Sequence, residues 1–137
     1  MSMGRLSVAL LVVLMAGCSM SDDVGLAEKQ VVQFHQQLDA GQIQRIYAAA
    51  AEPMRKATSE QDMEALLAAV HRKLGMVKSS RRGAWSVNTN TSGTYVSLSY
   101  STHFSEGDAT ERFGYQVDGG KALLLGYHIN SNALVEK

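Results

Sequence analysis

The sequence is poor in the residues that mark several common classes of protein. It has one cysteine and one proline in 137 residues, and its 13 basic and 13 acidic residues give a formal net charge of zero. A single cysteine cannot form an intrachain disulfide, so the fold must be stabilised by packing. Proteins that bind nucleic acid normally carry a strongly basic face, which this balance of charge does not favour. We therefore expect neither a disulfide framework nor a nucleic-acid partner.

The sequence also lacks an apolar run long enough to cross a membrane. The main apolar run extends from Leu6 to Met15, and its ten residues would span only about 15 Å as a helix, half of a bilayer core. The basic residue Arg5 precedes the run, and the small residues Ala16 and Gly17 follow it. This order is typical of a secretory signal peptide.

The only cysteine, Cys18, stands at the end of that signal. The stretch Leu14-Met15-Ala16-Gly17-Cys18 resembles the lipobox of bacterial lipoproteins, except that Met15 occupies the place where Leu is commonest. The resemblance implies that residues 1–17 are a signal peptide and that Cys18 carries a thioether-linked diacylglycerol and an acyl chain such as palmitate on its amine. The alternatives are an ordinary signal that ends near a buried thiol, or a core helix.

The residues that follow Cys18 bear on its location. Ser19 occupies the place where Asp favours retention in the inner membrane of enteric bacteria, so the resemblance implies an outer-membrane anchor with the domain facing the periplasm. We expect residues 18–23 to form the lipidated cysteine and a short polar tether, and residues 24–137 to form one domain.

Helical periodicity dominates the first half of the domain. Apolar residues recur at spacings of three and four, as in the stripe formed by Ala27, Val31, Phe34 and Leu38. This pattern predicts helices over residues 24–39, 42–51 and 58–74, with one further turn at 53–57. Expected boundary signals are an N-cap at Asp23, a capping box from Thr58 to Gln61 and a C-cap at Gly75.

From Met76 the apolar period changes from helical to two. Alternation predicts strands over residues 77–89, 94–104, 113–117 and 122–129, separated by polar turns at 88–93, 105–108 and 118–120. Short connections between successive strands favour an antiparallel meander. The predicted class is α+β, with three N-terminal helices packed on one face of a four-stranded antiparallel sheet.

Residues 24–130 have a second resemblance. The Leu74-Gly75 helix end and the long strands through Tyr127 and Ile129 are similar to the cystatin-like, ketosteroid-isomerase-like cone, and to small secreted proteins of that fold. Residues 52–59 are too few for the extra strand of many members, so a shallower cone is expected. The isomerases use a carboxylate base and a tyrosine. Neither aligns with a residue of this chain, so no catalytic residue and no cofactor are carried over.

Histidines give little evidence of a catalytic or metal site. Their positions, 35, 71, 103 and 128, lack the spacing of metal ligands, so no metal site is expected. His103 and Glu111 lie on neighbouring predicted strands. Such a pair can perform acid–base chemistry or be ordinary cross-strand neighbours, and the second is the expectation. His35, beside the apolar stripe of the first helix, is expected to be a surface or partly packed residue and not a ligand.

Lys78, Arg81 and Arg82 form the only basic cluster. They are either the solvated start of a strand or a contact site for anionic lipid head groups or lipopolysaccharide.

The sequence therefore predicts a membrane-anchored envelope lipoprotein with a non-enzymatic binding domain, whose partner is an envelope protein or a small ligand. The alternative is a small-substrate enzyme with a pocket on the concave face of the sheet. A cluster of His, Glu and Tyr around an enclosed apolar cavity would favour the enzyme. A filled core with an exposed apolar patch would favour the binding domain.

Overall fold

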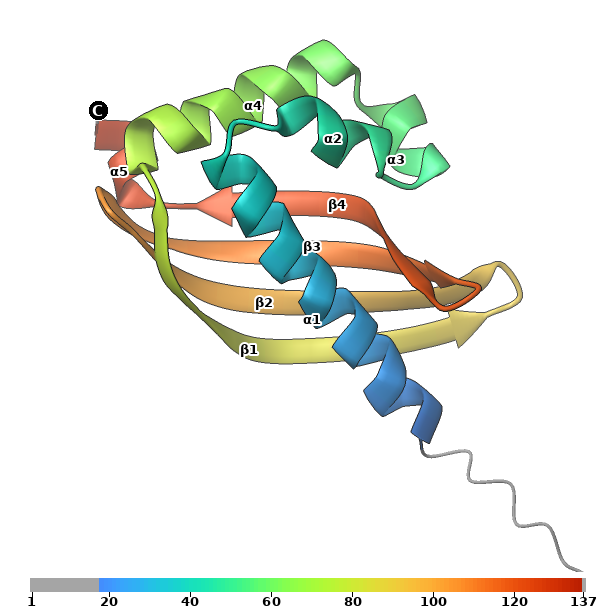
Figure 1. Ribbon diagram of the computed structural model, residues 1–137. Coiled ribbons are helices and arrows are strands. Elements are labelled where there is room, and N and C mark those ends of the chain that lie inside the picture. The colour runs from blue at the N-terminus through green and yellow to red at the C-terminus, as the bar shows by residue number, and fades with distance from the viewer. Residues whose placement is uncertain (1–17, 137) are drawn as a thin grey trace, which may run out of the picture.

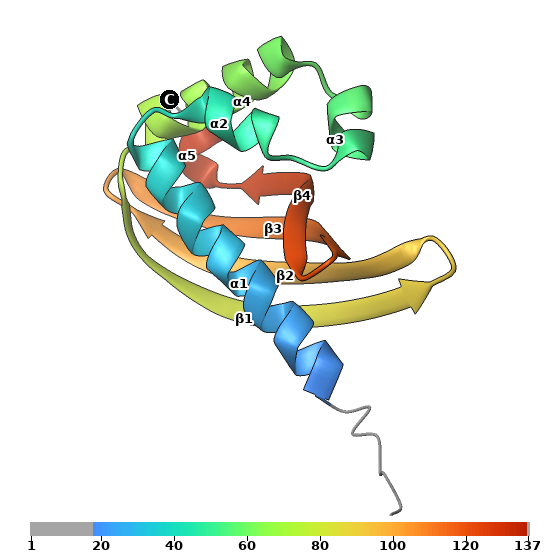
Figure 2. The same cartoon turned by 45° about the vertical axis from the view of Figure 1, so that its right-hand side comes forward.

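One face of an antiparallel sheet carries the main helices, as Figures 1 and 2 show for the computed structural model, which describes residues 18–136. The strands, which pair in chain order, are β1 (Val77–Asn90), β2 (Gly93–Phe104), β3 (Gly107–Asp118) and β4 (Lys121–Asn130). The helices are α1 (Cys18–Asp39), α2 (Ile43–Ala48), α3 (Glu52–Ala57), α4 (Glu60–Leu74) and α5 (Asn132–Glu136). The expected α+β class and the four-stranded meander are confirmed.

Strand alternation determines which side chains meet the helices. Leu98 on β2 lies opposite Trp85 on β1 and Phe113 on β3, so these three side chains share the face of the sheet that the helices cover. Leu98 and Phe113 have no exposed surface, and they join apolar residues of α1 and α4 in one core cluster. The opposite face of β2 carries Ser97, Ser99 and Ser101, so this face is rich in hydroxyl groups.

Helix α1 begins earlier than expected. It starts at Cys18, so the prediction that residues 18–23 form a tether and that Asp23 caps the helix was wrong. Extending an existing helix costs far less than starting one, and Val24 is buried, so the first turns continue a helix that is already fixed by packing. Within residues 18–136, no helix combines the length and apolar character that crossing a membrane requires.

The other differences from expectation lie at the ends of elements. The further turn expected at 53–57 is present as the short helix α3, which begins at Glu52, whereas the C-terminal helix α5 was not predicted. Helix α4 is capped by Ser59, whose hydroxyl accepts a hydrogen bond from the Asp62 N–H at 3.1 Å, rather than by the expected box. The turn between β2 and β3 contains only Ser105 and Glu106.

Two glycines that follow helices provide a matched pair of mutations. Gly41 and Gly75 have φ of 72° and 77°, which L-residues rarely adopt. An added Cβ would meet nothing within 4 Å at Gly41, but would lie 2.0 Å from Ser105 Oγ at Gly75. That hydroxyl accepts a hydrogen bond from the Met76 N–H at 3.1 Å.

We expect Gly41→Ala to lower the free energy of unfolding by about 1 kcal/mol, because only backbone strain is introduced. Gly75→Ala should cost about 2–4 kcal/mol, because Ser105 must also move and give up its hydrogen bond. Urea denaturation of both variants measures the difference. Equal losses would show that Ser105 adapts freely to the new methyl group.

Candidate functional site

A buried carboxylate lies at the centre of the interface between helices and sheet. Glu111 belongs to the inward-facing set of β3, between Ala109 and Phe113, and none of its surface is exposed to solvent. Burial of an uncompensated carboxylate is strongly unfavourable, so its oxygens need hydrogen-bond donors. Three side chains from three different elements supply them.

The donors converge on both carboxylate oxygens of Glu111. The Thr102 hydroxyl on β2 donates to Oε1 at 2.6 Å, and the Tyr127 hydroxyl on β4 donates to Oε2 at 2.5 Å. His35 Nε2, on α1, lies 2.7 Å from Oε1. With an ionised Glu111, the hydrogen of the His35 ring is on Nε2. We call these four residues the Glu111 network.

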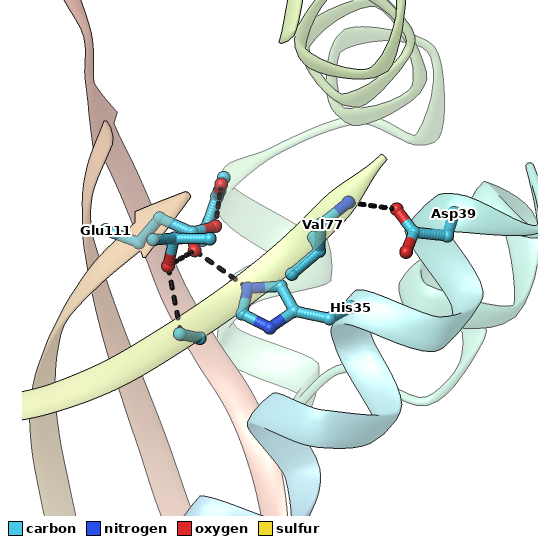
Figure 3. A network of polar contacts seen from close by, with 7 residues as sticks. His35, Asp39, Val77 and Glu111 are labelled. Carbon is cyan, nitrogen blue, oxygen red and sulfur yellow. Dashed lines mark hydrogen bonds and ion pairs between the residues drawn. The ribbon is translucent and has the colours of Figure 1, made fainter. Parts of the chain in front are cut away.

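Two polar contacts, one turn apart, tie the C-terminal half of α1 to the sheet. His35 points from α1 toward Glu111, and the next turn places Asp39 Oδ1 3.1 Å from the Val77 N–H, from which it accepts a hydrogen bond (Figure 3). One contact reaches β3 and the other reaches β1. They therefore fix the position of α1 along its own axis and its rotation about that axis. Apolar packing alone would allow more variation in both.

The tyrosines of this region stay protonated. Burial raises the pKa of Tyr127 far above its ordinary value, and the nearby Glu111 charge raises it further. Burial, with Tyr100 and Glu111 nearby, also raises the pKa of Tyr115 strongly, and burial raises the pKa of Tyr100 to about 12. Tyr127 therefore acts as a hydrogen-bond donor to Glu111 and not as a base.

Aromatic rings surround the network. The Phe113 ring lies 5.1 Å from the rings of both Phe34 and Tyr127, measured between centroids, and 5.9 Å from the His35 ring. Several of these contacts are edge-to-face, a favourable arrangement for aromatic pairs. The network is thus enclosed by packed rings from α1, β3 and β4.

Little space for a substrate lies beside this cluster. Two small clefts between the helices and β4 have volumes of about 30 and 80 Å³. Glu111 lines neither of them, although Tyr127 is part of the wall of the larger one. Ligand pockets are usually several hundred cubic ångströms, whereas these spaces hold a few water molecules at most. One condition for an enzyme, the convergence of His, Glu and Tyr, is met. The second condition, an enclosed apolar cavity at these residues, is not met by either cleft, because neither His35 nor Glu111 lines them.

Comparison with known proteins identifies the family. A family model described as "Protein of unknown function (DUF4019)" matches residues 30–127. The chain belongs to this family. The matched range includes all four residues of the Glu111 network, while Cys18 and the first turns of α1 precede it. No curated protein matches the chain at a significant level.

Two solved structures resemble this member of the DUF4019 family. Aln2 from a Streptomyces species is 13% identical, with a TM-score of 0.52, over 89% of this chain and 96% of that one. A protein from Novosphingobium aromaticivorans, assigned as a scytalone dehydratase, is 9% identical, with a TM-score of 0.50, over 84% of this chain and 87% of that one. At these identities the similarity establishes the fold alone, which is the ketosteroid-isomerase-like cone.

The histidines predicted on the sheet lie on its other face. His103 Nδ1 contacts Asp108 Oδ1, its direct cross-strand partner, on the face away from the helices. The suggested neighbour relation between His103 and Glu111 was therefore wrong, because Glu111 pairs in register with Tyr100. His35, expected to be a surface or partly packed residue, is more enclosed than that, since it is buried against Glu111. His128 is exposed on β4, opposite Arg112.

His103 and Asp108 lie in an open hollow of about 340 Å³ on this outer face. Its walls are mainly hydroxyl and amide side chains, including Ser101, Thr110 and Asn130. Most of the surface of the His103 and Asp108 side chains remains exposed, at 67% and 73%. Their charges are therefore well screened by solvent, and neither group is held in the enclosed environment typical of catalytic acids and bases.

The predicted basic cluster does not form one basic face. Strand alternation places Arg81 opposite Ser101, on the outer face, and Arg82 opposite Tyr100, on the helix face. Arg82 Nε also lies 3.0 Å from Glu28 Oε1 on α1, which neutralises it locally. Lys78 is exposed near the start of β1.

Proposed function

We propose that this member of the DUF4019 family is a lipoprotein of a bacterial cell envelope. In this proposal, lipid on Cys18 anchors the protein, by preference in the outer membrane, and the cone domain faces the periplasm. The observation that carries the proposal is the position of the only cysteine, directly after a ten-residue apolar run and the small pair Ala16-Gly17.

We further propose that the domain binds a protein partner or a small ligand and performs no catalysis in its interior. Support comes from the Glu111 network, in which both carboxylate oxygens already accept hydrogen bonds from neighbouring side chains. A general base needs a lone pair directed at the substrate proton and space for the substrate beside it. Clefts of about 30 and 80 Å³ do not offer that space to a substrate.

The alternative is an enzyme that acts on a small substrate, and one specific observation favours it. His35, Glu111 and Tyr127 converge at one buried point, and one structural neighbour is assigned as a dehydratase. In that case the helices over the concave face would have to open to admit the substrate. The Glu111 substitutions argued in the Discussion distinguish the two functions.

Replacement of Cys18 tests the anchor. We expect the full-length protein to sediment with membranes, and Cys18→Ala to be released in soluble form or to accumulate as the unprocessed precursor, because the acceptor thiol is gone. The matched control is Ser19→Ala, which should stay membrane-bound and processed. Membrane fractionation and mass spectrometry of the mature protein provide the measurements. An unmodified thiol, or cleavage at another position, would refute lipid attachment.

A further inference from the structure

A groove runs between the N-terminal half of α1 and the edge strand β1. Its walls are formed by Met20, Val24, Gly25 and Glu28 from α1 and by Arg82 and Trp85 from β1, and its volume is about 680 Å³. We call it the α1–β1 groove. It belongs to neither the Glu111 network nor the hollow on the outer face.

Large apolar side chains stay exposed at this groove. Met20 and Trp85 are 46% and 48% exposed. Val32 does not line the groove, but it is 58% exposed. It follows Gly25 by seven residues, or about two helical turns, and so lies on the same side of α1. Within residues 18–136, these three make up half of the large apolar side chains that remain exposed. Such a concentration of exposed apolar groups on one side is typical of an interaction surface.

The groove lies at the end of the domain where the chain enters it. In both views the N-terminal end of α1 extends past the β1 edge of the sheet, whereas α2, α3 and α4 gather toward the β4 side (Figures 1 and 2). Cys18 is the first residue of α1, and the groove residues of α1 lie between Met20 and Glu28. At 1.5 Å per residue, they lie within about 15 Å of Cys18 along the helix axis.

The charged residues that line the groove compensate each other. Arg82 and Glu28 form an ion pair of 3.0 Å, with 34% and 41% of their side chains exposed. The groove therefore presents two apolar side chains beside a neutral pair, instead of a basic patch. Tryptophan is enriched at membrane–water interfaces, where its ring is apolar and its N–H group can still meet a polar partner.

We propose that the α1–β1 groove faces the bilayer and that Met20 and Trp85 enter its interfacial layer. The domain then rests on the membrane with its β1 edge, and α2 to α4 point away from it. The proposal rests on the lipid anchor at Cys18 proposed above. Because α1 begins at Cys18, the link between the acylated residue and the groove is a helix instead of a flexible tether, so membrane attachment brings the groove to the lipid surface.

The only tryptophan of the chain is the reporter for the test. The lipidated mature protein, which begins at Cys18 in this proposal, is reconstituted in vesicles of phosphatidylcholine and phosphatidylethanolamine, with and without lipids brominated near the start of the acyl chain. We expect a blue shift of Trp85 emission on reconstitution and loss of most of this emission with brominated lipid. The matched control is the Trp85→Phe/Leu66→Trp double variant, since Leu66 is similarly exposed, at 45%, but lies on α4. Its emission should be unaffected by the brominated lipid.

Flotation of the same vesicles separates the two proposals. If the protein does not float with lipid, the anchor is refuted, and the membrane-facing groove is refuted with it. If the protein floats but brominated lipid leaves Trp85 emission unchanged, the anchor stands and the groove proposal is overturned. Equal quenching of Trp85 and of the reporter on α4 would also overturn it, because the domain would then have no fixed orientation. The quenching is expected in vesicles without anionic lipid. The ion pair of Arg82 with Glu28 leaves the groove without a net charge, so anionic lipid is not needed to attract it.

Discussion

Glu111→Leu is expected to lower the free energy of unfolding by about 3–5 kcal/mol, although leucine has nearly the volume of glutamate. The substitution leaves the hydroxyls of Thr102 and Tyr127 and the Nε2 of His35 without their acceptor, in a site that solvent does not reach. Each orphaned buried donor costs about 1–3 kcal/mol. Glu111→Gln keeps one oxygen and should cost less, about 1–2 kcal/mol. Urea denaturation gives both values.

A double-mutant cycle assigns the loss to the network. Tyr127→Phe removes one donor, and we expect it to cost about 1–3 kcal/mol in the wild-type chain but much less in the Glu111→Leu background, where the hydroxyl already lacks its partner. The matched control is Glu64→Gln, a substitution of the same chemistry at an exposed position on α4, which should change stability by less than about 0.5 kcal/mol.

The opposite result would support the enzyme. Functional groups are often held in arrangements that reduce stability, so removing a catalytic carboxylate commonly stabilises a protein. If Glu111→Leu or Glu111→Gln raises the midpoint of unfolding, the network is not a structural element, and the concave face should be examined for substrate. If both lower it, the buried carboxylate serves the fold, as the binding function requires.

The elements with strong periodicity were predicted well from the sequence. The stripe of α1 and the alternation of β2 each repeat over several turns or pairs, so one face had to be buried whatever the topology. The helix ends were less certain. Asp23 has the chemistry of an N-cap, yet α1 continues to Cys18, because adding turns to a helix that packing already holds costs little.

The Glu111 network was not predicted, and the reason is its distance along the chain. His35 and Glu111 are separated by 76 residues, and only the docking of α1 on the sheet brings them together. One signal was available. Glu111 belongs to the alternating set with Ala109 and Phe113, which puts a charge at an inward position of β3, where it requires partners. Which residue of β4 reaches Glu111 depends on the pairing of β3 with β4, whose register shifts between Gly114 and Tyr115.

The predicted basic cluster lies at the exposed start of a strand, as the first of its two interpretations expects, but its residues do not share one face. Lys78, Arg81 and Arg82 are close in sequence, but alternation along a strand separates adjacent side chains onto two faces. The ion pair of Arg82 with Glu28 then depends on the packing of α1 over β1. Proximity in sequence therefore indicates a charged patch reliably on a loop, and much less so on a strand.

The layered core gives the second large expected effect. Leu67→Ala on α4 and Leu98→Ala on β2 should each lower the free energy of unfolding by about 2–5 kcal/mol, through lost apolar burial and the cavity that remains. Leu67 is 1% exposed and Leu98 is not exposed, and both belong to the same core cluster, as expected from the sequence. Thermal and urea denaturation should report the loss for both variants.

Leu66→Ala is the matched control for this prediction. Leu66 is the same residue type at the adjacent position of α4, but it is 45% exposed, so its truncation removes less buried surface and leaves no closed cavity. We expect a loss below about 1 kcal/mol for this variant. If Leu66→Ala costs as much as Leu67→Ala, then α4 presents a different side to the sheet. If neither Leu67→Ala nor Leu98→Ala lowers stability, the packing of the helix layer on the sheet is refuted, because a filled core does not tolerate a closed cavity without loss.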